Sequence, residues 1–127
     1  MSEGIVTLYR PIGQAERDLI RASGDRAFPP RLAHQPIFYP VTNEGYATQI
    51  ARDRNTRDAA SGFVGYVTRF RVRTAFLGQY TPRIVGGRQH EKYWIPAADL
   101  DALNHNIVGP IEIIAEFHPC TVSPRGL

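Results

Sequence analysis

The sequence predicts one α+β domain in which short helices pack on a mixed or antiparallel sheet. Strand-like and helix-like segments alternate along its 127 residues. The segment over residues 63–73 alternates apolar and arginine side chains with the period of a half-buried strand. Long crossover connections, which a doubly wound parallel sheet needs, are missing. The length suits a single domain over 1–127, with its core at 7–117 and a frayed tail at 118–127.

The composition is that of an ordinary globular domain. Hydrophobic residues make up 43% and charged residues 21% of the chain, so disorder of the whole chain is not expected. Cys120 is the only cysteine, which excludes an internal disulfide. No run approaches the roughly 20 apolar residues of a membrane span, and residues 1–7 lack the pattern of a signal peptide. We therefore expect a cytoplasmic protein without a membrane partner.

The positive charge comes almost entirely from arginine. The formal net charge is +3, and Lys92 is the only lysine. Arginine pairs bidentately with phosphate or carboxylate, so an arginine-rich domain could hold a phosphorylated ligand. Solvated surface arginines are the simpler interpretation. The arginines are spread along the chain, which does not indicate a nucleic-acid partner. The sequence leaves the oligomeric state open, a homodimer included.

The N-terminal half contains four predicted elements, each bounded by a local signal. Pro11 should end the first strand, because proline cannot donate to a ladder. Gly24 should end the first helix, and Asn43 should cap the second. In order, the elements are a strand over 4–10, a helix over 14–23, a strand over 36–41 and a helix over 44–52.

The C-terminal half begins with a polar loop over 53–62 and then the clearest strand of the chain. Arg69, Arg71 and Arg73 alternate onto the face opposite Phe70 and Val72, which predicts one packed and one wet face. Pro96 suits the first position of a helix. The predicted elements are strands over 63–73, 83–85 and 107–117, a helical turn over 74–79, a loop entering a strand over 89–95, and a helix over 97–103.

Several familiar catalytic and binding motifs are absent from the sequence. There is no phosphate-binding loop, dinucleotide glycine fingerprint or nucleophile elbow. The four histidines follow no zinc-ligand spacing, so we predict no metal site.

Polar and aromatic residues gather instead where predicted strands meet loops. An arginine such as Arg10 can pair with pyrophosphate, and a tyrosine ring such as Tyr39 can stack on a flat base. A carboxylate such as Glu91 can accept ribose hydroxyls and stabilise the positive charge that develops when a glycosidic bond breaks. Each has a structural alternative, namely a surface ion pair for Arg10, core packing for Tyr39 and Tyr46, and solvation for Glu91.

The segments 7–13, 28–32, 35–41, 46–53 and 93–97 carry a family resemblance. Through them the chain, from about Thr7 to Ile114, resembles the short bacterial proteins labelled ADP-ribosylation/crystallin J1. The order of elements is similar to the ADP-ribosyltransferase-like fold, which implies a split sheet and a site for NAD.

Carried over residue by residue, the resemblance implies that Arg10, with Tyr9 beside it, grips the phosphates or ribose of NAD. Tyr39 or Tyr46 would stack on nicotinamide. Glu91, flanked by His90 and preceded by Gln89, would hold the ribose as nicotinamide leaves. Members of the family tend to place the glutamate directly before the aromatic–tryptophan pair, where this chain has Lys92. Because one residue reverses the direction of a side chain in a strand, either Glu91 or Lys92 could face the cleft.

The leading hypothesis is therefore an ADP-ribosyltransferase-like domain that binds NAD or a related nucleotide and transfers ADP-ribose to an unidentified acceptor or to water. A second hypothesis is a non-catalytic module that binds a small molecule or a protein with the same fold. A third is an enzyme that uses His90 or Tyr39 as an acid or base. The first predicts that Arg10, Tyr39 and Glu91 line one cleft.

Overall fold

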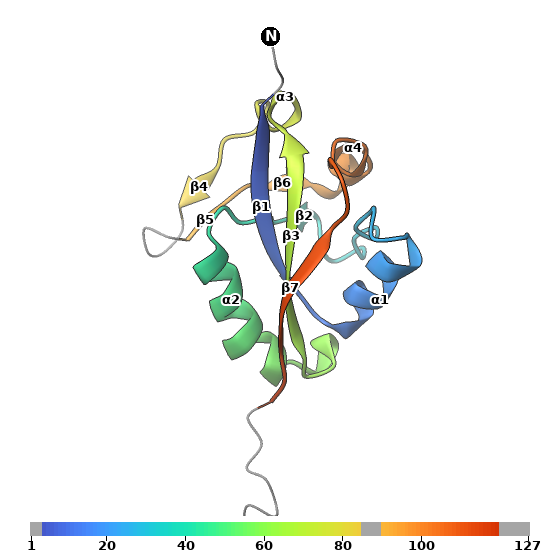
Figure 1. Ribbon diagram of the computed structural model, residues 1–127, viewed down its shortest axis with the longest axis vertical. Coiled ribbons are helices and arrows are strands. Elements are labelled where there is room, and N and C mark those ends of the chain that lie inside the picture. Colours follow the sequence, from blue (N-terminus) through green and yellow to red (C-terminus); the bar gives the residue numbers. More distant parts are fainter. Residues whose placement is uncertain (1–3, 85–89, 120–127) are drawn as a thin grey trace, which may run out of the picture.

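A three-stranded antiparallel sheet forms the centre of the protein. The structure, a computed structural model, describes residues 4–84 and 90–119 (Figure 1). The central sheet has the strand order β1–β3–β7, and both pairings are antiparallel. Its strands are β1 (Ile5–Ile12), β3 (Gly65–Arg73) and β7 (Glu112–Phe117). Together with the helices, this sheet confirms the predicted α+β class.

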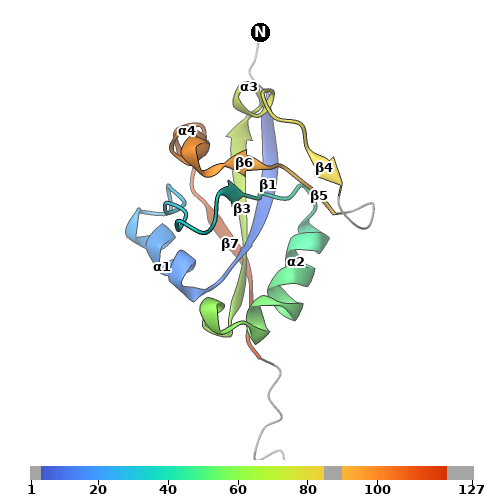
Figure 2. The same cartoon turned by 180° about the vertical axis from the view of Figure 1, so that it is seen from behind.

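Two extended segments, 36–42 and 91–97, pair with each other and cross one face of the sheet; we call them the cross ribbon (Figure 2). Their backbones join through Tyr93 N–H to Pro40 O at 2.9 Å and Ala97 N–H to Pro36 O at 2.8 Å. A single bridge, Tyr9 to Val41, ties the ribbon to β1. The ribbon contains β2 (Ile37–Phe38), β5 (Glu91–Lys92) and β6 (Ile95–Pro96), and β2 pairs with β6. Strand β4 (Arg83–Ile84) lies outside the ribbon and pairs with β5.

Short helices surround the sheet and the cross ribbon. Asn43 caps α2 by accepting a hydrogen bond from Tyr46 N–H at 2.8 Å, and Gly24 follows α1 with a φ of +78°, as the sequence predicts. The helices are α1 (Gln14–Ala22), α2 (Glu44–Asp53), α3 (Thr74–Leu77) and α4 (Leu100–His105), with 3₁₀ turns at η1 (Asn55–Arg57), η2 (Ala59–Ser61) and η3 (Ala97–Asp99). No helix within the described ranges is long and apolar enough to cross a membrane.

The larger of two hydrophobic clusters lies between the sheet and the cross ribbon. Phe28, Phe38 and Phe70 form its aromatic centre. The ring centroid of Phe28 lies 5.0 Å from that of Phe38 and 4.8 Å from that of Phe70. All three rings are buried, so this cluster holds the ribbon against the sheet.

A smaller cluster lies on the other face, beneath α2. Ala47 and Ala51 of α2 pack there against Val67 and Val41. Gly65 allows this contact, because a Cβ at that position would lie 2.1 Å from the Ala51 carbonyl oxygen. The sequence therefore fixes α2 close to β3 by using a glycine where the two backbones meet.

Pro11 lies inside β1, so the prediction that it ends the strand is wrong. Tyr9 N–H donates to Val41 O at 2.9 Å, which shows that odd-numbered N–H groups of β1 point toward the cross ribbon. The ribbon bridges β1 only at Tyr9. Proline at 11 therefore removes no ladder hydrogen bond, and the strand continues to Ile12.

Three other predictions need adjustment. Pro96 ends strand β6, opposite Ile37, and the helix begins after the turn η3. The polar segment 53–62 contains the ordered turns η1 and η2. The face of β3 with Arg69 and Arg71 is not wholly wet, because Val67 on that face is buried beneath α2. Arg69 and Arg71 themselves are half exposed, and both lie within 4 Å of Glu112. Val85 and the tail from Cys120 onward lie outside the described residues.

Candidate functional site

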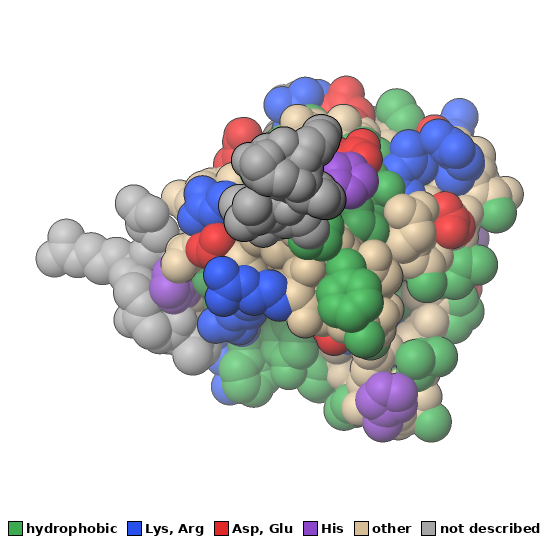
Figure 3. Space-filling model, turned by 90° about the horizontal axis from the view of Figure 1, so that it is seen from below, with side chains coloured by type: hydrophobic (Ala, Val, Ile, Leu, Met, Phe, Trp, Pro, Cys, Tyr) green, Lys and Arg blue, Asp and Glu red, His purple; other side chains and the backbone are tan. Residues whose placement is uncertain are grey.

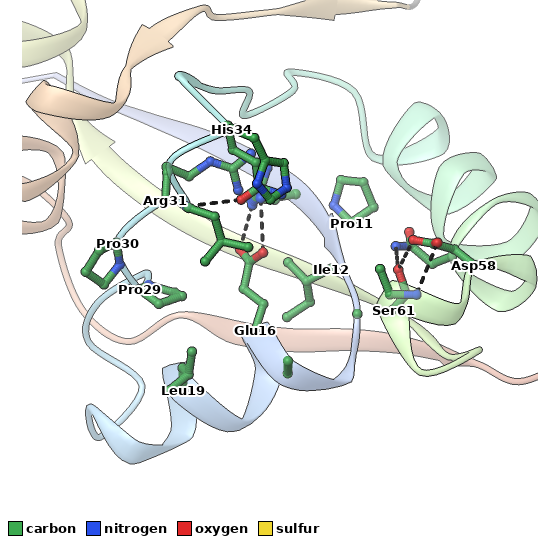
Figure 4. Close-up of a pocket in the computed structure, with 17 residues that line it drawn as sticks. Pro11, Ile12, Glu16, Leu19, Pro29, Pro30, Arg31, His34, Asp58 and Ser61 are labelled. Carbon is green, nitrogen blue, oxygen red and sulfur yellow. Dashed lines mark hydrogen bonds and ion pairs between the residues drawn. The ribbon is translucent and has the colours of Figure 1, made fainter.

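A cavity of about 500 Å³ opens between α1, the loop over 29–35 and the turns η1 and η2. We call it the arginine cavity, because Arg10 and Arg31 both line it (Figure 4). Pro11 and Ile12 of β1 form part of its wall. The loop reaches this position because Phe28 is anchored in the core directly before Pro29 and Pro30.

Arg10 is a buried arginine that already has a carboxylate partner. Its Nε donates to Glu16 Oε2 at 2.7 Å and its Nη2 donates to Glu16 Oε1 at 3.0 Å, a bidentate pair between β1 and the first turn of α1. The guanidinium carbon lies 4.4 Å from the centre of the Phe38 ring. These contacts fix the orientation of Arg10 and neutralise its charge.

Arg31 is a half-buried arginine whose charge has no such partner. It makes no ion pair within residues 4–84 and 90–119, and its Nε is buried without a hydrogen-bond partner. Its guanidinium carbon lies 5.9 Å from the Phe38 ring centre. Burial, and next the charge of Arg10, lower the pKa of Arg31, while Glu16 and Tyr39 act in the opposite direction. The surroundings therefore disfavour its charge, which an arginine nevertheless keeps.

A short hydrogen-bond chain forms the other end of the arginine cavity. Asn55 Nδ2 donates to Ser61 Oγ at 2.9 Å, and Ser61 Oγ donates to Asp58 Oδ2 at 2.8 Å. Asn55 Oδ1 is buried and has no hydrogen-bond partner. The exposed carboxylate of Asp58 gives this end acceptor character, in contrast to the cationic end.

A second, smaller cavity of about 310 Å³ lies beside α2; we call it the α2 cavity. The rings of Tyr46 and His90 stack there, with centroids 4.1 Å apart and planes 11° apart. Asp53 also lines it and accepts two hydrogen bonds from Arg52, which lowers the pKa of that carboxyl. The structure thus brings together Tyr46 and His90, two of the predicted ligand-binding residues.

Neither Tyr39 nor Glu91 lines the arginine cavity, so Arg10, Tyr39 and Glu91 do not share it. Tyr39 meets Trp94 edge-on at 5.7 Å, and Lys92 Nζ lies 5.0 Å from the Tyr39 ring centre. The backbone alternates at this point, so Phe38 faces the core and Tyr39 does not.

Glu91 and Lys92 point to different places, as expected for neighbours in a strand. Glu91 Oε1 accepts a hydrogen bond from the Thr42 hydroxyl at 2.9 Å, whereas Lys92 lines the α2 cavity. Tyr9 packs against the small cluster beneath α2. Gln89 lies outside the described residues.

Arg31, Glu16, Asn55 and Asp58 are not among the site residues predicted from the sequence. The Pro29-Pro30 pair is the one local signal for Arg31, because two prolines stiffen the backbone directly before it. The pairing of Glu16 with Arg10 follows from the tight turn at Gly13, which reverses the chain between β1 and α1.

No group of three or more potential metal-ligating side chains occurs in the part of the chain that the structure describes. Seen from below, the basic side chains of the described residues that are visible are interspersed with acidic and apolar ones and form no continuous basic surface (Figure 3). No family model, curated protein or solved structure matches the chain.

Proposed function

We propose that this domain binds an anionic, nucleotide-type small molecule, NAD or a related compound, in the arginine cavity. The observation that carries the proposal is Arg31, a half-buried guanidinium without a carboxylate partner in the described ranges. A buried charge is costly unless it is paired. A phosphate placed against Arg31 supplies the missing acceptor and the missing opposite charge.

The rest of the cavity suits a ligand that also carries rings. Its volume of about 500 Å³ lies within the range typical of small-molecule sites. Leu19 and Leu32 line it while 54% and 60% exposed, beside Pro29 and Pro30. These apolar surfaces lie next to the cationic end, so a ring system can bury them while its phosphate contacts Arg31.

Arg10 has a supporting role in this proposal. Its bidentate bond to Glu16 occupies two of its donors and holds the guanidinium beside Arg31. Arg10 lowers the pKa of Arg31 by like-charge repulsion, and an anion bound to Arg31 relieves that repulsion. The pair Arg10–Glu16 therefore shapes the site, and Arg31 makes the contact.

In the catalytic form of the proposal, the domain breaks the nicotinamide–ribose bond of NAD and transfers ADP-ribose. The family resemblance supports this form. Glu91 would stabilise the oxocarbenium-like sugar in that reaction. The non-catalytic form, a binding module that uses the same cavity, is the second candidate. One observation favours it: Glu91 is hydrogen-bonded to Thr42 outside the arginine cavity.

Calorimetric titration of the full chain with NAD, together with an assay for nicotinamide release, tests both forms. We expect binding that Arg31→Gln weakens about tenfold or more, because a charge-assisted hydrogen bond is lost. Arg26→Gln is the matched control, since Arg26 is exposed in the same connection between α1 and β2 and lines neither cavity. Equal NAD affinities in Arg31→Gln and wild type would refute the proposal.

Nicotinamide release separates the two forms. Release that Glu91→Gln abolishes supports the transferase. Binding without release supports the binding module. Release that Glu91→Gln leaves unchanged removes Glu91 from the mechanism.

A further inference from the structure

The two ends of the arginine cavity have opposite hydrogen-bonding character. Arg31 and His34 lie at one end, Asp58 and Ser61 lie at the other, and Pro11 and Ile12 lie between them (Figure 4). A ligand that spans the cavity therefore meets donors at one end and acceptors at the other.

The acceptor character of the second end follows from proton counting. Ionised Asp58 can only accept, so the hydrogen bond of 2.8 Å between Asp58 Oδ2 and Ser61 Oγ uses the single hydroxyl proton of Ser61. Ser61 Oγ can then only accept from Asn55, which places the amide nitrogen of Asn55 toward Ser61 at 2.9 Å. The amide orientation of Asn55 is thus fixed, and its Oδ1 is the atom left without a partner.

Asp58, which is exposed to solvent, adds to this end a negative charge without an ion-pair partner in the described ranges. Its carboxylate accepts from Ser61 and from Ala60 N–H, the latter at 3.2 Å, and it forms no ion pair with any residue in 4–84 and 90–119. Two acceptor sites of a carboxylate remain after two hydrogen bonds. The end therefore favours O–H or N–H donors and repels a second anion.

The backbone holds this end rigidly against the strand that carries Arg10. A Cβ on Gly13 would lie 2.5 Å from Ser61 Cα, so only glycine lets the turn after β1 approach η2 this closely. Gly62, directly after η2, has a φ of +72°, which also favours glycine. The acceptor end is preorganised, which reduces the entropy lost when a ligand binds.

From this geometry we propose that Asn55 and Asp58 bind ribose hydroxyls of the nucleotide and select against a phosphate on that ribose. The inference rests on the proposed function, because it assumes that the phosphates of the ligand contact Arg31. Carboxylates bind ribose diols in this manner in other nucleotide sites, where a 2′-phosphate is excluded by charge. Asn55 and Asp58 are then specificity-determining residues.

Titration of the full chain with NAD and with NADP tests the inference, because the two differ by one phosphate on a ribose hydroxyl. We expect wild type to prefer NAD by about tenfold or more, since like charges would meet at Asp58. Asp58→Asn should bring the two affinities together. Asn55→Ala should weaken NAD about fivefold or more through loss of an acceptor. Arg57→Gln, an exposed neighbour, is the control.

The outcomes separate this inference from the proposed function. Equal affinities of the wild-type protein for NAD and NADP, with binding that still depends on Arg31, overturn the inference alone. A preference for NAD that Asp58→Asn leaves unchanged also overturns it. An affinity for NAD that does not depend on Arg31, or no binding at all, overturns the proposed function and the inference together. The wild-type comparison needs no variant and therefore does not depend on the folding of any substitution.

Discussion

The arginine cavity and the α2 cavity differ in how far their polar groups are satisfied. In the α2 cavity, Asp53 is paired with Arg52, His90 stacks on Tyr46, and Lys92 lies over the Tyr39 ring. In the arginine cavity, Arg31 Nε and Asn55 Oδ1 are buried without partners. Natural proteins leave few buried polar atoms unsatisfied.

The difference is the basis of the proposal that a ligand binds in the arginine cavity and not in the α2 cavity. An unpartnered buried atom alone does not define a site, because Trp94 Nε1 is also buried without a partner and lines neither cavity. The sequence pattern favoured aromatic and charged residues near the ends of predicted strands as candidate site residues. Of the predicted residues, Tyr46 and His90 lie in the satisfied cavity and Arg10 lies in the unsatisfied one. Four substitutions, ordered by expected effect, can break or sharpen this comparison.

The largest expected effect comes from removing one partner of the buried pair. Arg10→Met leaves Glu16 as an unpaired, largely buried carboxylate, and should lower the free energy of unfolding by about 3 kcal/mol. Urea denaturation measures this change. Arg52→Met, which breaks the exposed pair near the α2 cavity, should have a much smaller effect. Similar losses in both variants would remove the distinction between the two pairs.

The second prediction separates binding from stability at Arg31. Arg31→Met should weaken NAD binding about tenfold or more without lowering the free energy of unfolding, because it removes a buried donor that has no partner. Calorimetry and urea denaturation of the same preparation give both quantities. A clear loss of stability with unchanged NAD affinity would make Arg31 a structural residue.

The third prediction concerns the stacked pair in the α2 cavity. Tyr46→Ala should lower the free energy of unfolding by at least about 1 kcal/mol, through loss of the stacked contact with His90 and of packing against the cluster beneath α2. The affinity for NAD should stay unchanged, because Tyr46 does not line the arginine cavity. Tyr46→Phe, which keeps the ring, is the control. A loss of affinity in Tyr46→Ala that Tyr46→Phe restores would place the ligand in the α2 cavity.

The smallest effect is a pH dependence at Asp53. Its hydrogen bonds to Arg52 lower the pKa of the carboxyl below its ordinary value of 3.8. The pair therefore stabilises the fold above that value and is lost as the pH falls through the lower, folded-state pKa. Asp53→Asn should be slightly less stable than wild type at pH 7 and equally stable at pH 2. A difference that persists at pH 2 would contradict this assignment.

The sequence predicted most elements of the fold because they depend on local patterns. The alternation over 63–73 identified β3, and Asn43 correctly marked the start of α2. Pro11 misled the prediction of β1, because the tolerance of a strand for proline depends on whether a neighbour needs its N–H. That neighbour, the cross ribbon, is a pairing between segments about fifty residues apart.

The site was less predictable than the fold for the same physical reason. Arg10 could be selected, because it lies near the end of a recognisable strand. Arg31, Asn55 and Asp58 lie in loops and 3₁₀ turns whose positions depend on packing around Phe28 and on the close approach of Gly13 to η2. Glu91 was expected beside Arg10, but its neighbour Lys92 takes the cavity-facing position at the α2 cavity.

Location of the ligand by NMR tests the central claim most directly. Titration of the ¹⁵N-labelled chain with NAD should shift backbone amide resonances from residues 10–16, 29–35 and 55–61, which surround the arginine cavity. Resonances from residues 46–54 and 90–92, around the α2 cavity, should move little. The largest shifts around the α2 cavity, or no shifts at saturating NAD, would contradict the account.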